Sequence, residues 1–373
     1  MNLSYWEKET WFSNVDFCVV GSGIVGLTCA LQLRKDFPKS KILVLERGVL
    51  PEGASTKNAG FACYGSVSEV LSDLETHTED EVFQLIKSRY EGLKLLRKTL
   101  GDKNISYKEH GGFEVFQNED KDLFEECKSR LTDVNKMVEP VFGKSTFKIK
   151  PNDFGFQKCI DQLILNPYEG QIDTGLMMNN LLKKVQASDI IVINGVKVEG
   201  FCSNKGSVQI RLKDFVFNVD QLFLATNAFA KHFFDLDLKP VRNQVIITKA
   251  IPGLKIKGVF HMNKGYYYFR NIGDRILFGG GRHLDPEKET TSKFGLTDTI
   301  QNRLEDILIN VIVPERDISI DYAWSGILGV GQRKKPIIRS VDDRVHLAAR
   351  LGGMGIAIGS KVGFDLAKLI KNN

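Results

Sequence analysis

A glycine turn between a strand and a helix constrains the fold of this chain more than any other feature. The run 16–20 predicts a buried strand, which leads through Gly21-Ser22-Gly23-Ile24-Val25-Gly26 into an apolar helical stretch. In such a turn Gly21 permits the tight bend, Gly23 lets the backbone approach a pyrophosphate, and Gly26 lets helix and strand pack closely. The helix also begins with N–H groups that favour an anion. The pattern therefore predicts a dinucleotide-phosphate site.

An acidic residue at the end of the next strand supports the same interpretation. The run 41–45 reads as a second parallel strand, and Glu46 follows it, twenty residues after Gly26. A carboxylate at that place accepts hydrogen bonds from a ribose 2′-OH. A glycine turn that only packed against its neighbours would leave this acid unexplained.

The composition excludes several classes of protein. The 373 residues are 42% hydrophobic and 26% charged, as in ordinary globular proteins, and suffice for two domains. The net charge of +5 is spread among interspersed acids, so we expect no nucleic-acid partner. The six cysteines form no CxxC pair and have no histidine at ligand spacing, which predicts a reduced, cytoplasmic protein without a metal site. The uncharged run 17–33 is shorter than the ~20 residues that span a membrane, so we expect no span.

We expect an α/β (α+β) fold in which a discontinuous, Rossmann-like nucleotide-binding domain carries an inserted substrate domain built on a largely antiparallel sheet. Apolar spacing predicts helices at 79–100, 122–134, 174–185, 296–310 and 361–371. Strand patterns occupy 189–193, 206–212, 215–219, 221–226, 243–248, 265–270, 275–279 and 345–349. Nucleotide-type elements at both ends place 15–80, 169–232 and 320–373 in the first domain and 81–168 and 233–319 in the second.

Three later segments carry a resemblance to a known family. They are Ala54-Ser55-Thr56-Lys57-Asn58-Ala59-Gly60-Phe61, Ala225-Thr226-Asn227-Ala228, and the tail from Trp324-Ser325-Gly326 to Gly359. Together with the glycine turn they resemble the D-amino-acid oxidase-like (DAO) superfamily of FAD-dependent oxidoreductases, with its glycine/sarcosine oxidase and gamma-glutamylputrescine oxidase branches. The resemblance covers residues 15–371 and implies that the cofactor is FAD and that the first domain binds it.

The resemblance assigns the cofactor contacts position by position. The pyrophosphate would lie on Gly21, Gly23, Ile24, Val25 and Gly26, and the adenosine ribose on Glu46 and Arg47. The ribityl chain and isoalloxazine would lie beside Ala54, Ser55, Asn58, Ala59, Gly60 and Phe61, with Val196 on adenine and with Thr226 and Gly326 nearby. Leu351, Gly352, Gly353, Met354, Gly355 and Ile356 would bring N–H groups and a helix N-terminus to the flavin's pyrimidine edge, where a helix dipole stabilises negative charge.

The chain departs from the family where a substrate carboxylate would bind. Leu328 and Gly353 stand at the places of two arginines that clamp an amino-acid carboxylate in glycine oxidase-like members. Without these bidentate donors, a plain α-amino acid is disfavoured as the substrate. Other arginines, among them Arg282, Arg333 and Arg350, remain open as substitutes.

Further departures concern the cofactor linkage and the electron acceptor. No cysteine follows Cys202, so the family's covalent attachment through a tail cysteine is absent and we expect noncovalent FAD. Leu277 stands near the place of the oxygen-activating lysine of sarcosine oxidases, which weakens direct use of O₂. The stretch 47–61 contains no histidine, which disfavours alcohol substrates because their oxidation needs a general base.

An aromatic strand supplies the predicted catalytic side chains. Alternation in Tyr266-Tyr267-Tyr268-Phe269 puts Tyr266 and Tyr268 on one face, which we predict faces the substrate cavity, and Tyr267 on the other. Aromatic packing within the sheet is the alternative for these tyrosines. His283 and Trp324 are secondary candidates.

These observations predict an FAD-dependent oxidoreductase that oxidises a C–N bond of an amine or N-substituted amine by hydride transfer to flavin N5. The imine product would hydrolyse in water, and O₂ or another acceptor would take the electrons. One alternative is an amino-acid dehydrogenase that passes electrons to a quinone or carrier protein. A second alternative is a flavoprotein that removes side-chain groups from wobble uridines of tRNA, and clustered basic patches would favour it. A third alternative is a noncatalytic FAD-binding scaffold.

Overall fold

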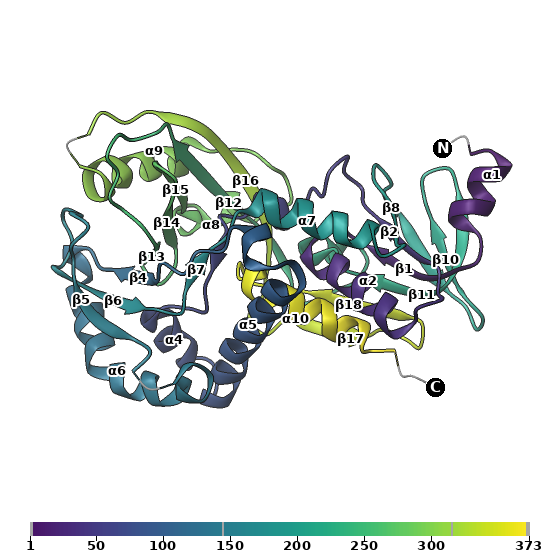
Figure 1. Ribbon diagram of the computed structural model, residues 1–373, viewed down its shortest axis with the longest axis horizontal. Coiled ribbons are helices and arrows are strands. Elements are labelled where there is room, and N and C mark those ends of the chain that lie inside the picture. The colour runs from purple at the N-terminus through teal and green to yellow at the C-terminus, as the bar shows by residue number, and fades with distance from the viewer. Residues whose placement is uncertain (1–2, 144, 315, 371–373) are drawn as a thin grey trace.

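The computed structural model describes residues 3–143, 145–314 and 316–370, which form two large sheets and a small one (Figure 1). In the first sheet the strand order is β17-β18-β11-β1-β2-β8, and β10 and β9 continue from β11. Its strands are β1 (Val15–Val20), β2 (Ile42–Leu45), β8 (Ile191–Ile193), β9 (Gly200–Ser203), β10 (Val208–Arg211), β11 (Val216–Leu224), β17 (Ile337–Ser340) and β18 (Val345–Ala349). The path from β18 to β8 is parallel throughout, which is the expected Rossmann-like arrangement.

The second sheet has the order β16-β12-β15-β14-β13-β4-β6-β5, and among these neighbours only β13 and β4 are parallel. Its strands are β4 (Gly112–Val115), β5 (Lys148–Pro151), β6 (Gln162–Asn166), β12 (Lys239–Thr248), β13 (Val259–Met262), β14 (Tyr267–Ile272), β15 (Arg275–Gly280) and β16 (Ile320–Val330). Phe260 and Phe269 stack across it with ring centroids 4.6 Å apart. The expected mixed fold with a largely antiparallel second sheet is confirmed. β3 (Phe61–Ala62) and β7 (Gly170–Gln171) form the small sheet.

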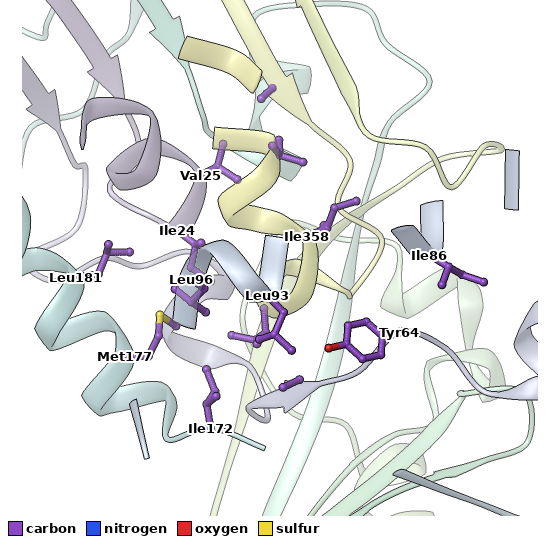
Figure 2. Packing of buried hydrophobic residues seen from close by; sticks show 14 of the residues in the cluster. Ile24, Val25, Tyr64, Ile86, Leu93, Leu96, Ile172, Met177, Leu181 and Ile358 are labelled. Atoms are coloured by element: carbon purple, nitrogen blue, oxygen red, sulfur yellow. The ribbon is translucent and has the colours of Figure 1, made fainter. Parts of the chain in front are cut away.

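Helices join the two sheets at the centre of the molecule, where α5, α7 and α10 lie between them in Figure 1. The helices are α1 (Tyr5–Glu7), α2 (Ile24–Asp36), α3 (Ala54–Lys57), α4 (Val67–Leu74), α5 (Glu79–Leu100), α6 (Lys121–Phe142), α7 (Thr174–Gln186), α8 (Pro286–Glu289), α9 (Asp298–Ile307) and α10 (Gly355–Ala367). α5 packs closely on α10, because a Cβ at Gly92 would overlap the Ala357 carbonyl. Figure 2 shows Leu93 and Leu96 of α5 in the same apolar cluster as Ile24 and Ile358.

The element bounds differ from the sequence expectations in several places; for example, α6 continues to Phe142, well beyond the expected end at 134, and β12 begins at Lys239 instead of 243. The runs 215–219 and 221–226 form the single strand β11, since Asp220 is an exposed residue on a continuous strand. The C-terminal helix begins at Gly355 and not at Lys361, because the small residues after the glycine cluster pack against α2. The expected end of that helix at Lys371 lies outside the described residues.

The division into domains remains a prediction. β16 opens the segment 320–373 but pairs with β12 of the second sheet, and residues 371–373 lie outside the described part. Within residues 3–143, 145–314 and 316–370, no helix combines the length and the apolar composition that crossing a bilayer requires.

Candidate active site

A cavity of about 990 Å³ extends from the carboxyl ends of β1, β2 and β11 to the face of the second sheet. Ligands of open parallel sheets bind at this end of the strands. Most of the predicted cofactor residues line the cavity: Gly21, Gly23, Ile24, Val25, Glu46, Arg47, Ala54, Ser55, Asn58, Ala59, Phe61, Val196, Thr226, Gly326, Leu351, Gly352, Gly353, Met354, Gly355 and Ile356. Gly26 and Gly60 do not line it, and each has another structural reason to be glycine.

The glycine turn is shaped by close backbone contacts. Gly21 has a φ of +104°, and a Cβ there would lie 2.8 Å from the Ala225 carbonyl oxygen of the neighbouring strand end. A Cβ at Gly26 would overlap the Gly21 carbonyl oxygen, so this residue permits the helix to approach the strand. The Ile24 N–H donates to the Ser55 hydroxyl at 3.0 Å, which ties the turn to the following loop.

Glu46 is a buried acceptor beside this turn. Its Oε2 accepts from the Ser22 N–H at 3.1 Å and from the Ser22 hydroxyl at 2.9 Å, and its Oε1 accepts from the Gly48 N–H at 3.0 Å. The Glu52 N–H also donates to Oε1, at the long distance of 3.5 Å. Of the roughly four lone-pair sites of a carboxylate, one is therefore only weakly used and is open to a ligand hydroxyl. Arg47 extends over the Phe229 ring, 3.8 Å from its centroid, and forms a 3.0 Å ion pair with Glu52.

The loop 54–61 is fixed by side chains of the second sheet. The Trp324 indole N–H donates to the Lys57 carbonyl at 2.9 Å, and the Arg270 Nε donates to the Ala59 carbonyl. A Cβ at Gly60 would lie 2.7 Å from the Arg270 guanidinium, so Gly60 makes room for this anchor. The Asn58 side chain accepts from the Gly60 N–H at 2.8 Å and closes the loop on itself.

The cavity wall has hydrogen-bonding groups that no protein group satisfies. The Thr226 hydroxyl and the side-chain amide oxygen (Oδ1) of Asn243 are buried there without a hydrogen-bond partner, whereas buried polar atoms are nearly always paired. α10 begins at Gly355, which lines the cavity, so its N-terminus offers N–H groups to a negatively polarised ring edge. The residues present therefore fit FAD.

The aromatic strand has two different faces. Tyr266 and Tyr268 line the cavity, whereas Tyr267 is buried in the core of the second sheet. Asn243 donates to the Tyr268 hydroxyl at 3.3 Å, while Tyr266 stands 37% exposed at the mouth. His283 packs on the Tyr266 ring with 4.6 Å between ring centroids and does not line the cavity, and neither does Trp324.

Apolar residues stand at the two positions for which the resemblance leads one to expect carboxylate-binding arginines. Leu328 and Gly353 both line the cavity, and a Cβ at Gly353 would be 3.7 Å from the Leu328 side chain. Arg350 turns away, since its guanidinium forms a 2.6 Å ion pair with Asp237. Arg333 is exposed and does not line the cavity. Of Arg282, Arg333 and Arg350, which the sequence analysis considered as substitutes, only Arg282 lines the cavity.

The comparison with protein families decides the identity of the fold. The model of the FAD-dependent oxidoreductase family DAO matches residues 16–369. The chain belongs to this family. Among curated relatives, a probable oxidoreductase OrdL of Haemophilus influenzae is 20% identical, with 97% of this chain and 84% of the relative covered. Gamma-glutamylputrescine oxidoreductase of Escherichia coli is 21% identical, with 96% and 84% covered.

A solved structure shows the same DAO fold. The crystal structure of glycine oxidase from Geobacillus kaustophilus superposes with a TM-score of 0.75, covering 95% of this chain and 94% of that one at 18% identity. At this identity the likeness establishes the fold alone.

Charged residues that were not predicted from the sequence also line the cavity, among them Glu69, Arg89 and His261. The His261 Nε2 lies 3.1 Å from Glu169 Oε2. Burial by itself lowers the pKa of His261, but the hydrogen bond and charge of Glu169, with Glu69 and Glu114 nearby, raise it to about 9. Burial raises the pKa of Glu69, but the positive charges of His261 and Lys334 outweigh it and hold the pKa below the ordinary value.

The sequence contained one signal for these residues. On α5 the buried positions recur at helical spacing, and Arg89 stands among Val82, Ile86 and Leu93 on that apolar face. A charged residue on a buried helix face is uncommon unless it is paired or binds a ligand.

Proposed function

We propose that this FAD-dependent oxidoreductase oxidises a C–N bond of an amine or N-substituted amine, and that the resulting imine hydrolyses in water. The observation that carries the proposal is the apolar wall at Leu328 and Gly353, which lacks donors for a carboxylate next to the reacting carbon. The named activity of one relative, gamma-glutamylputrescine oxidoreductase, supports an amine substrate.

The cofactor would be held noncovalently. The glycine turn would bind the pyrophosphate, Glu46 the ribose, the loop 54–61 the ring system, and the start of α10 its pyrimidine edge. FAD, when bound, supplies a hydride acceptor at N5. Burial raises the pKa of the Cys63 thiol well above its ordinary value, so the cysteine that lines the cavity stays a thiol and is a poor nucleophile.

The side chains of the cavity would bind and orient the amine. The hydroxyl of Tyr268, positioned by Asn243, would orient the amine at the second sheet, and Tyr266 would cover the mouth. These contacts supply proximity and orientation, which account for a large share of many rate enhancements.

The second candidate, a dehydrogenase with an acceptor other than O₂, is favoured by one residue. Leu277 is buried in an apolar cluster with Ala59 and Val245, near the place where the resemblance to sarcosine oxidases would put their oxygen-activating lysine. Rapid mixing of the reduced protein with air-saturated buffer and with a soluble quinone tests it. Slow reoxidation in air and fast reoxidation by the quinone are expected for the dehydrogenase.

Anaerobic bleaching of the bound flavin tests the substrate class. The panel contains glycine, sarcosine, D-alanine, proline, putrescine derivatives and secondary amines. We expect amines and N-alkylated compounds to reduce the flavin faster than simple α-amino acids, because a buried carboxylate without a partner costs several kcal/mol. Most efficient bleaching by glycine or D-alanine would show that Leu328 and Gly353 do not decide the substrate.

A further inference from the structure

Arg89 is a buried cation whose hydrogen-bonding capacity is mostly unused. Its side chain is 6% exposed, and it lines the cavity from α5. One guanidinium nitrogen donates to the Tyr64 carbonyl at 2.6 Å, while the buried Nε has no partner. Among the described residues no carboxylate forms an ion pair with it within 4 Å. A guanidinium has five N–H donors, so the protein itself leaves this group unsatisfied.

The surrounding charges favour a monoanion as the missing partner. Burial lowers the pKa of Arg89, and the nearby carboxylates of Glu69 and Asp73 counteract this effect. Three further basic residues, Lys264, Arg282 and Lys334, line the cavity, and of these Lys334 is paired with Asp73, whereas the acids in the lining are Glu46 and Glu69. Excess positive charge in a cleft attracts anions. The Glu69 carboxylate repels a dianion more than a monoanion, which favours a carboxylate over a phosphate group.

We propose that Arg89 binds a carboxylate of the substrate, at a point away from the carbon that is oxidised. The site is on the α4 and α5 wall, whereas the family's clamp positions, Leu328 and Gly353, lie on β16 and before α10 and offer no charged donor. The planar fork of a guanidinium matches a carboxylate with two parallel hydrogen bonds. This inference rests on the proposed amine oxidation and specifies the substrate as an amine that carries a remote carboxylate.

The binding test uses glutarate, a dicarboxylate that has no amine to oxidise. Perturbation of the visible flavin absorption of the FAD-loaded protein reports its dissociation constant. We expect Arg89→Met to weaken glutarate binding about ten- to a hundredfold, as for the loss of a charge-assisted pair, and Arg89→Lys to weaken it less. Arg97→Met is the matched control, since Arg97 lies on the same helix but pairs with Asp102 at the surface, and it should bind glutarate like the wild type.

A purely structural role for Arg89 predicts a different result. Arg89→Met would then lower the melting temperature, while the FAD-loaded fraction would bind glutarate with unchanged affinity, and the inference would be overturned. Arg89→Lys provides a second, charge-conserving variant if the methionine variant does not fold. Equal affinity in wild type, Arg89→Lys and Arg97→Met would likewise count against the proposal.

Turnover separates this inference from the proposed function. For 5-aminopentanoate and pentylamine, we expect the carboxylate to lower KM about tenfold in the wild type and to confer no advantage in Arg89→Met. If no amine reduces the flavin but glutarate binding still depends on Arg89, amine oxidation is refuted and the carboxylate site stands. If α-amino acids are the best substrates of the wild type and are no longer preferred by Arg89→Met, Arg89 binds a carboxylate next to the reacting carbon, and its remote placement is wrong.

Discussion

Replacing Glu46 should reduce FAD affinity by an amount that the structure bounds. Its carboxylate accepts from the Ser22 N–H, the Ser22 hydroxyl and the Gly48 N–H, and we assign it a further bond to the ribose. A hydrogen bond to a charged group contributes about 1.5–3 kcal/mol, which corresponds to about ten- to a hundredfold in affinity. Glu46→Gln keeps the shape but loses the charge and should fall in this range. Glu46→Ala also strands the protein donors, so it should bind FAD more weakly still.

Equilibrium titration of the apoprotein with FAD, followed by quenching of flavin fluorescence, measures these dissociation constants. Glu52→Gln is the control, because Glu52 is a neighbouring acid that pairs with Arg47. It should bind FAD within about twofold of the wild type, as expected when only an exposed ion pair is lost. Unchanged affinity in both Glu46 variants would refute the ribose contact and reduce Glu46 to a residue that shapes the turn.

Three further results are expected. Acid precipitation should release all flavin into the supernatant, and flavin that remained with the denatured protein would contradict noncovalent binding. Glu289→Ala should lower the free energy of unfolding in urea by about 3–5 kcal/mol, because it leaves the buried charge of Arg242 unpaired; the Arg242 guanidinium bonds both Glu289 carboxylate oxygens, at 2.7 and 2.9 Å. As the control, Asp306→Ala removes an exposed ion pair and should lower it by under about 1 kcal/mol. The pKa of His261 is raised to about 9 from 6.5, which adds stability that is complete below pH 6.5 and lost as the pH rises through 9. His261→Gln should therefore flatten the fall of the unfolding free energy between pH 6.5 and 9. An unchanged slope would contradict the raised pKa of His261.

Local signals in the sequence predict several elements well, in both halves of the molecule. The bounds of α5 are confirmed at Glu79 and Leu100, since Thr78 caps the start and Gly101 follows the end. The parallel strands β1 and β2 lie where their apolar runs predict them. Such features depend on residues only a few positions away along the chain, so a local sequence pattern predicts them.

The remainder depends on contacts between distant segments. The sequence analysis assigns β16 to the first domain, with the rest of 320–373, but β16 pairs with β12 of the second sheet, and this pairing is set by tertiary packing, which no local pattern reports. The charged cavity wall was missed for the same reason. Glu69 and His261 come from α4 and β13, and only the docking of these elements brings their side chains to within 3.9 Å.

The anchoring of the loop 54–61 makes flavin content a gauge of completed assembly. Its carbonyls are held by Arg270 and Trp324, which follow their partners by 211 and 267 positions. During synthesis the glycine turn is complete long before either anchor emerges from the ribosome. A nascent or truncated chain can therefore form the nucleotide strands yet lacks the fixed loop. The ratio of flavin to protein in a preparation would then count molecules in which both sheets have docked.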